Sequence, residues 1–150
     1  MKFNVTSFNA EGLSAAKGDL LTQLGTDVLC LQKPHKTTAP PKIPGMHLVI
    51  FHGSRVQGSD FYIRDKTSVK SCFDHSADGL ELLRVKANNI TITSVYKPPP
   101  TPFKWPEDLS TDDGVHLVIG DFNSHSTNWG YSDTNKDGEL GMKSGPWKGA

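Results

Sequence analysis

The chain has 150 residues, the size of one domain with a sizeable core. Its 16 Lys and Arg residues balance its 16 Asp and Glu residues, which disfavours a strong nonspecific DNA binder because phosphate contacts need excess positive charge. No apolar run approaches transmembrane length, and no apolar signal segment follows Met1. We therefore expect an intracellular protein, in the cytoplasm or the nucleus, that has no membrane partner.

The chain has two cysteines, Cys30 and Cys72. Both lie inside apolar runs, where a cysteine behaves as a small hydrophobic residue. We expect both to be buried free thiols in a reducing compartment, because two cysteines in a chain of this size do not form a disulfide framework.

The first third of the chain alternates between strand and helix patterns. Residues 2–8 alternate apolar with polar side chains and predict a strand. Residues 13–24 place apolar residues at helical spacing between a capping serine and a glycine, which predicts a helix. Residues 27–32, DVLCLQ, predict a second strand. This order of strand, helix and strand favours parallel pairing in an α/β protein.

The patterns in the middle of the chain predict a loop and then a series of strands. Residues 33–46 hold four prolines without periodicity and predict a loop. Asp78 and Gly79 have the composition of a two-residue hairpin turn. The strands that we expect here span residues 47–52, 59–64, 69–73, 80–86 and 90–96. The last of them is rich in β-branched residues and ends where a proline run begins.

The next apolar run, residues 116–119, stops at Gly120 and presents Asp121 and Asn123. In an extended chain, residues two apart point to the same side. A carboxylate and an amide oxygen then face one point, which suits a hard cation or a polarised water molecule. An Asp- and Asn-rich turn after a strand accounts for the same residues equally well.

Polar residues also stand at the ends of the other strands. Asn9 and Glu11 follow the first strand, Gln32 ends the second, and Tyr96 ends the strand before the prolines. Polar groups that converge from several strand ends are typical of a metal site built from oxygen ligands. We expect these residues to share one site with Asp121.

The segments SFNAEGL, DVLCLQ, SVYKPPP and GDFNSHSTNWG follow one another in this order. Together they resemble the endonuclease/exonuclease/phosphatase superfamily, and most of all the apurinic-type endonuclease domains of non-LTR retrotransposons. The resemblance extends from residue 2 to residue 139. It implies an α/β fold, a two-sheet β-sandwich flanked by helices. It also implies Mg²⁺ as cofactor, DNA as partner, and hydrolysis of a phosphodiester as activity.

The resemblance also implies roles for single residues. Asn9 and Glu11 correspond to residues that help to bind metal and phosphate. Tyr96 corresponds to a tyrosine that contacts the phosphate. Asp121 and Asn123 correspond to residues that orient the attacking water and the phosphate.

Two departures from the family pattern bear on activity. Lys33 stands where the family has a glutamate, its principal magnesium ligand. The family's closing Asp-His pair has no counterpart before Ala150. The resemblance therefore implies a truncated, degenerate copy that lacks its carboxyl-terminal part, with weakened magnesium binding and impaired or lost activity. The alternative is a non-catalytic module that binds nucleic acid or another phosphate ligand.

The end of the chain carries weaker patterns. We expect a partial domain over residues 1–140 and a disordered Gly- and Pro-rich tail over residues 141–150. Residues 133–139 match the opening of a calcium-binding loop, but Ser144 stands where its last carboxylate ligand belongs, which favours an Asx-rich turn. A sandwich without its closing strands exposes sheet edges, so we also expect self-association.

Overall fold

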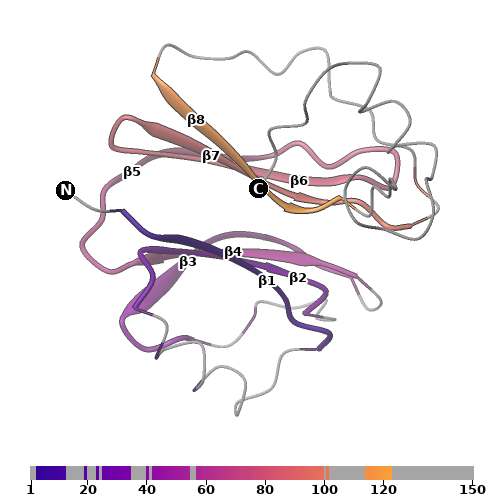
Figure 1. The fold of residues 1–150 in the computed structure, drawn as a ribbon, viewed down its shortest axis with the longest axis horizontal. Coiled ribbons are helices and arrows are strands. Elements are labelled where there is room, and N and C mark those ends of the chain that lie inside the picture. The colour runs from indigo at the N-terminus through magenta and orange to yellow at the C-terminus, as the bar shows by residue number, and fades with distance from the viewer. Residues whose placement is uncertain are drawn as a thin grey trace, which may run out of the picture.

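The computed structural model describes residues 3–12, 19, 23, 25–34, 40, 42–54, 57–99, 101 and 114–122. Within these ranges the chain forms two four-stranded sheets that stack as a two-layer sandwich (Figure 1). The helix expected over residues 13–24 lies almost wholly outside the described residues, although Asp19 is helical. No helix in the described part of the chain has the length and apolar character needed to span a membrane.

The first sheet has the order β1-β2-β4-β3. Its strands are β1 (Val5–Asn9), β2 (Val28–Gln32), β3 (Met46–His52) and β4 (Ser59–Arg64). β1 and β2 pair in parallel, as the alternation of strand and helix patterns predicts. β4 runs antiparallel to both β2 and β3. The carboxyl ends of β1 and β2 therefore meet the beginning of β4 at one end of the sandwich.

The second sheet has the order β5-β6-β7-β8. Its strands are β5 (Val69–Asp74), β6 (Glu81–Ala87), β7 (Ile90–Tyr96) and β8 (Val115–Asp121). The first three are antiparallel, and β7 and β8 are parallel. The predicted hairpin turn is confirmed, because Asp78 and Gly79 both have positive φ (54° and 83°), as a type I′ turn requires.

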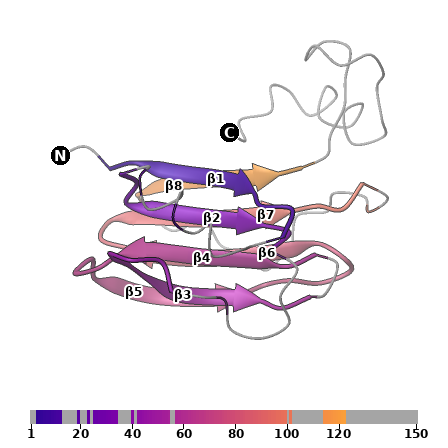
Figure 2. The ribbon, with the colours of Figure 1, turned by 90° about the horizontal axis from the view of Figure 1, so that it is seen from below.

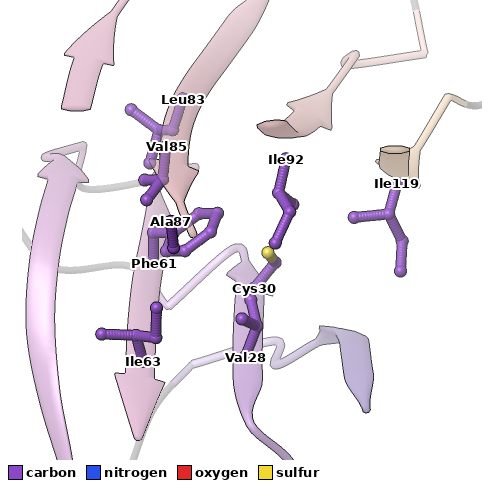
Figure 3. Packing of buried hydrophobic residues seen from close by; sticks show 9 residues of the cluster. All are labelled: Val28, Cys30, Phe61, Ile63, Leu83, Val85, Ala87, Ile92 and Ile119. Carbon is purple, nitrogen blue, oxygen red and sulfur yellow. The ribbon is translucent and has the colours of Figure 1, made fainter. Parts of the chain in front are cut away.

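The core lies between the two sheets (Figure 3). Side chains alternate along each strand, so every second residue of the inner strands points into it. Its buried members are Val28, Cys30, Phe61, Ile63, Leu83, Val85, Ala87, Ile92 and Ile119. The other face of β2 and β4 contributes a second cluster of Leu29, Leu31, Ile43 and Tyr62. β2 is therefore buried on both faces, which explains the unbroken apolar run VLCL.

The apolar run stops at Gly120, but the strand does not. β8 continues through Gly120 to Asp121, in parallel register with β7. Gly120 has φ +153°, and a Cβ at this position would lie 1.9 Å from the carbonyl oxygen of Val95. The glycine is needed for the close approach of the two strands, and it does not mark a turn.

The prediction of two buried thiols holds for Cys30 and is wrong for Cys72. Burial raises the pKa of the Cys30 thiol to about 12, so it stays protonated. Cys72 lies on β5, the outermost strand of its sheet, whose side chains are largely exposed. The apolar pattern around Cys72 did not show that its strand lies at an edge.

Candidate functional site

The strand register places polar residues in one row of each sheet. In the first sheet, Asn9 pairs with Gln32, Gln32 with Ser59, and Ser59 with His52. In the second sheet, Glu81 pairs with Tyr96, and Tyr96 with Asp121. We call these residues the polar end of the sandwich: Asn9, Gln32, Ser59, His52, Glu81, Tyr96 and Asp121.

Hydrogen bonds across the sandwich join the two rows. The Asn9 side-chain amide donates to Asp121 Oδ2 over 3.2 Å, and the Ser59 hydroxyl donates to Glu81 Oε1 over 2.6 Å. These contacts link β1 to β8 and β4 to β6. In Figure 2 β1 lies in front of β8, and the hydrogen bond between them brings together two residues more than a hundred positions apart in the sequence.

Glu11 and Lys33 lie just beyond the first row, on two segments that continue the pairing of β1 and β2. The amide of Ala10 donates to the carbonyl of Gln32 over 2.8 Å, and the amide of Gly12 donates to the carbonyl of Lys33 over 2.7 Å. Glu11 and Lys33 both have positive φ, 45° and 55°. This conformation costs a non-glycine residue about 1 kcal/mol or more, so the surrounding hydrogen bonds hold both residues in place.

The side chains of these two residues form an ion pair beside Tyr96. Lys33 Nζ lies 3.2 Å from Glu11 Oε1 and 5.7 Å from the centroid of the Tyr96 ring. Burial alone lowers the pKa of Lys33, but hydrogen bonds to Glu11 and Tyr96 outweigh it and raise the pKa. The ammonium is therefore charged at neutral pH.

The pKa of Tyr96 is also raised. Burial is the main cause, Lys33 lowers the pKa, and the carboxylates of Asp121 and Glu81 raise it. The hydroxyl therefore keeps its proton at neutral pH and is able to donate a hydrogen bond to an anionic ligand.

Glu81 is a buried carboxyl group that the sequence analysis did not single out. It is 4% exposed and accepts hydrogen bonds from the Ser59 hydroxyl and, over 3.2 Å, from the amide of Gly58. Burial raises its pKa in spite of these donors. Its one sequence signal is a carboxylate directly after a hairpin turn, at the start of an apolar strand.

Asp60 is a second buried carboxyl group beside the polar end. Burial, followed by repulsion from Glu81, raises its pKa to about 7. Its Oδ2 atom is buried and has no hydrogen-bond partner. A buried carboxylate with one oxygen left without a hydrogen bond is costly when it is charged.

A cavity of about 330 Å³ opens beside His52 and Glu81. The loop after β3 and the turn before β6 line it: Gly53, Ser54, Gln57, Ser76, Ala77, Gly79 and Leu80 complete the wall. His52 Nδ1 lies 2.8 Å from Asp74 Oδ2. Burial raises the pKa of Asp74, but hydrogen bonds to Ser76 and His52 outweigh it and lower the pKa. The sequence alone did not indicate this cavity.

No family model matches the chain, and no curated protein matches it. Solved structures do. An AP endonuclease from Archaeoglobus fulgidus is 17% identical, with a TM-score of 0.44, over 63% of this chain and 41% of that one. The endonuclease domain of TRAS1, a telomere-specific non-LTR retrotransposon, is 13% identical, with a TM-score of 0.57, over 95% of this chain and 68% of that one.

The match with the TRAS1 domain covers nearly the whole chain and therefore includes both sheets of the sandwich. The chain has an endonuclease/exonuclease/phosphatase fold. The fold expected from the sequence motifs is thereby confirmed. At 13% identity this likeness concerns the fold alone, and the chain spans less than half of the archaeal endonuclease structure.

Within this fold the structure brings most of the expected site residues together. Asn9 contacts Asp121, and Tyr96 is the register neighbour of Asp121. Glu11 joins the group through Lys33, which lies against Tyr96. Asn123, the segment 133–139 and the tail 141–150 lie outside the described residues.

The residues around Lys33 do not fit the magnesium ion that the fold family implies. The ammonium of Lys33 pairs with the Glu11 carboxylate, which is the oxygen ligand expected at this end of β1. Among the described residues, no group of three or more His, Cys, Asp or Glu side chains is arranged to hold a metal ion. A divalent cation would have to displace the ammonium or share its carboxylate with a like charge.

Proposed function

We propose that the chain is a DNA-recognising domain with an endonuclease fold, in which magnesium-dependent phosphodiester hydrolysis is impaired. The ion pair between Lys33 and Glu11 is the observation that carries this proposal. The pair places the positive charge of Lys33 beside the Glu11 carboxylate, to which the resemblance assigns metal binding. The proposed location is intracellular, with nuclear DNA as the ligand.

Three hydrogen-bond donors support phosphate recognition at the polar end. They are the Asn9 amide, which donates to Asp121, and the Tyr96 hydroxyl and Lys33 ammonium, which lie near each other. A phosphate oxygen accepts hydrogen bonds from all three kinds of group. Since the net charge of the chain is zero, binding would depend on these donors more than on a long-range field.

Two assays test the two parts of this proposal. We expect the chain to leave supercoiled plasmid intact in magnesium buffer, because the Glu11 carboxylate is paired. We expect a gel shift of duplex DNA in EDTA that weakens at higher salt. Magnesium-dependent nicking would contradict the impairment, and the absence of any shift at low salt would contradict DNA recognition.

The balance of charges supports a second candidate, a module for a phosphate ligand other than nucleic acid. A neutral chain has little electrostatic preference for a polyanion over a small phosphate compound. Competition separates the two candidates. If inorganic phosphate or a phosphomonoester displaces duplex DNA at a concentration similar to that of the DNA phosphates, the second candidate holds.

A further inference from the structure

We propose that the Lys33 ammonium is a built-in counter-ion that replaces a divalent metal ion at the polar end. It neutralises the carboxylate of Glu11 and keeps the site folded in the absence of metal. The inference relies on the proposed function only for the position of the site, and it does not require that DNA binds.

The distribution of charge at this end is the first argument. Carboxyl groups of Glu11, Asp121 and Glu81 gather at the same end of the sandwich, and each has a different partner. Glu81 has the Ser59 hydroxyl and the Gly58 amide, and Asp121 has the Asn9 amide. Glu11 pairs with a full positive charge, the ammonium of Lys33. Lys33 therefore supplies the charge that a metal ion would otherwise bring to this carboxylate.

The backbone around Lys33 is the second argument, because it fixes the point from which the side chain reaches Glu11. The amide of Lys33 donates to the carbonyl of Gly58 over 3.0 Å, and its own carbonyl accepts from the amide of Gly12 over 2.7 Å. Its φ of 55° is unusual for a lysine, and its partner Glu11 shares this conformation. The Glu11 side chain is 59% exposed, so the backbone hydrogen bonds, and not burial of the ion pair, keep the two residues next to each other.

The Tyr96 ring is the third argument. The ammonium lies 5.7 Å from the ring centroid, within the range of a cation–π contact, and the side chain of Lys33 is 24% exposed. An aromatic face and a carboxylate together attract a compact monovalent cation. A divalent ion, by contrast, requires several oxygen ligands. The position therefore suits an ammonium better than magnesium.

The decisive experiment compares metal responses of the parent and of Lys33→Glu. We expect the melting temperature of the parent to be the same in EDTA and in millimolar Mg²⁺. We expect Lys33→Glu to melt lower in EDTA and to recover in Mg²⁺, and calorimetry to show magnesium affinity raised by about ten-fold or more. A magnesium affinity of the parent equal to that of the variant would overturn the proposal, as would an unchanged melting temperature in EDTA.

Lys66→Glu is the matched control. Lys66 is an exposed lysine that also has positive φ (71°), in the turn after β4. The same reversal of charge there should not change the response to metal. If Lys33→Glu does not fold, Lys33→Gln replaces it, since glutamine removes the charge while keeping much of the length. We then expect a lower melting temperature in EDTA that Mg²⁺ partly restores, and an unchanged melting temperature would overturn the proposal.

The same samples separate this inference from the proposed function. A gel shift of the parent in EDTA reports on DNA recognition, and the metal response of the variants reports on Lys33. If the parent gives no gel shift while the variants respond to metal as expected, only DNA recognition is contradicted. If the parent gives the gel shift while the variants do not respond to metal as expected, only the counter-ion role of Lys33 is contradicted.

Discussion

The same strands build two unlike ends of the sandwich. Along β2, the residues that face the second sheet change from Val28 to Gln32, and along β4 they change from Ile63 to Ser59. The core shown in Figure 3 fills the apolar end, whereas the polar end is held by hydrogen bonds and an ion pair. The apolar end supplies stability, which allows the polar end to keep buried carboxyl groups and strained backbone.

The largest effect should come from the apolar end. Phe61→Ala removes a fully buried ring and should cost about 3–5 kcal/mol of unfolding free energy. Ser59→Ala, two residues away on the same strand, leaves the Glu81 carboxylate with one donor fewer and should cost about 1–2 kcal/mol. Urea denaturation measures both. Equal costs would mean that the apolar and polar ends contribute equally to stability, which would contradict the contrast between them.

Asp60 should dominate the pH dependence. Its pKa of about 7 in the folded state exceeds the ordinary value of 3.8, so the folded state binds the proton more tightly. Its stabilising contribution is complete below pH 4 and is lost as the pH rises to about 7. Asp60→Asn should therefore be more stable than the parent above pH 7, by on the order of 4 kcal/mol, and similar to it near pH 4.

Denaturation curves across this pH range measure the effect. Asp78→Asn is the matched control, because Asp78 is exposed in the β5–β6 turn. Its stability curve should run parallel to that of the parent. A parallel curve for Asp60→Asn as well would show that folding leaves the pKa of Asp60 near its ordinary value, which would contradict this prediction.

A smaller effect is expected where the polar end joins β1 to β8. Asn9→Asp places a second carboxylate at the position of the amide that lies 3.2 Å from Asp121. We expect DNA affinity in a gel shift to fall by about ten-fold, which corresponds to about 1.4 kcal/mol, through loss of a donor and added repulsion. Asn89→Asp, an exposed change between β6 and β7, should leave the affinity unchanged. Equal losses would indicate a general effect of negative charge.

The last prediction concerns self-association through the edge strands of the two sheets, where we expect the smallest effect. Within the described strands, β1 and β8 end their sheets side by side (Figure 2), and Phe8 on β1 is 44% exposed. If the chain self-associates through this edge, Phe8→Lys should lower light scattering. Phe73→Lys is the control, because Phe73 is 64% exposed on β5 at the opposite edge. Scattering that falls only with Phe73→Lys would move the association to β5.

Local patterns in the sequence determined the strands and part of the site. Alternation and turn residues predicted the strands from β1 to β8 and the turn at Asp78–Gly79, because both depend on neighbouring residues. The motifs also indicated that Asn9, Tyr96 and Asp121 stand at strand ends. The parallel pairing of β1 and β2 then follows from the order of strand, helix and strand patterns.

The tertiary structure alone decided what lies across the sandwich. The contacts of Asn9 with Asp121 and of Ser59 with Glu81 join residues of different sheets, and no local pattern specifies which rows face each other. The need for Gly120 likewise comes from the backbone of the neighbouring strand. In the sequence, Lys33 indicates only that a metal ligand expected at this position is missing. Its role as the partner of Glu11 appears only when β1 and β2 pair, because the two residues are then held by adjacent strand ends.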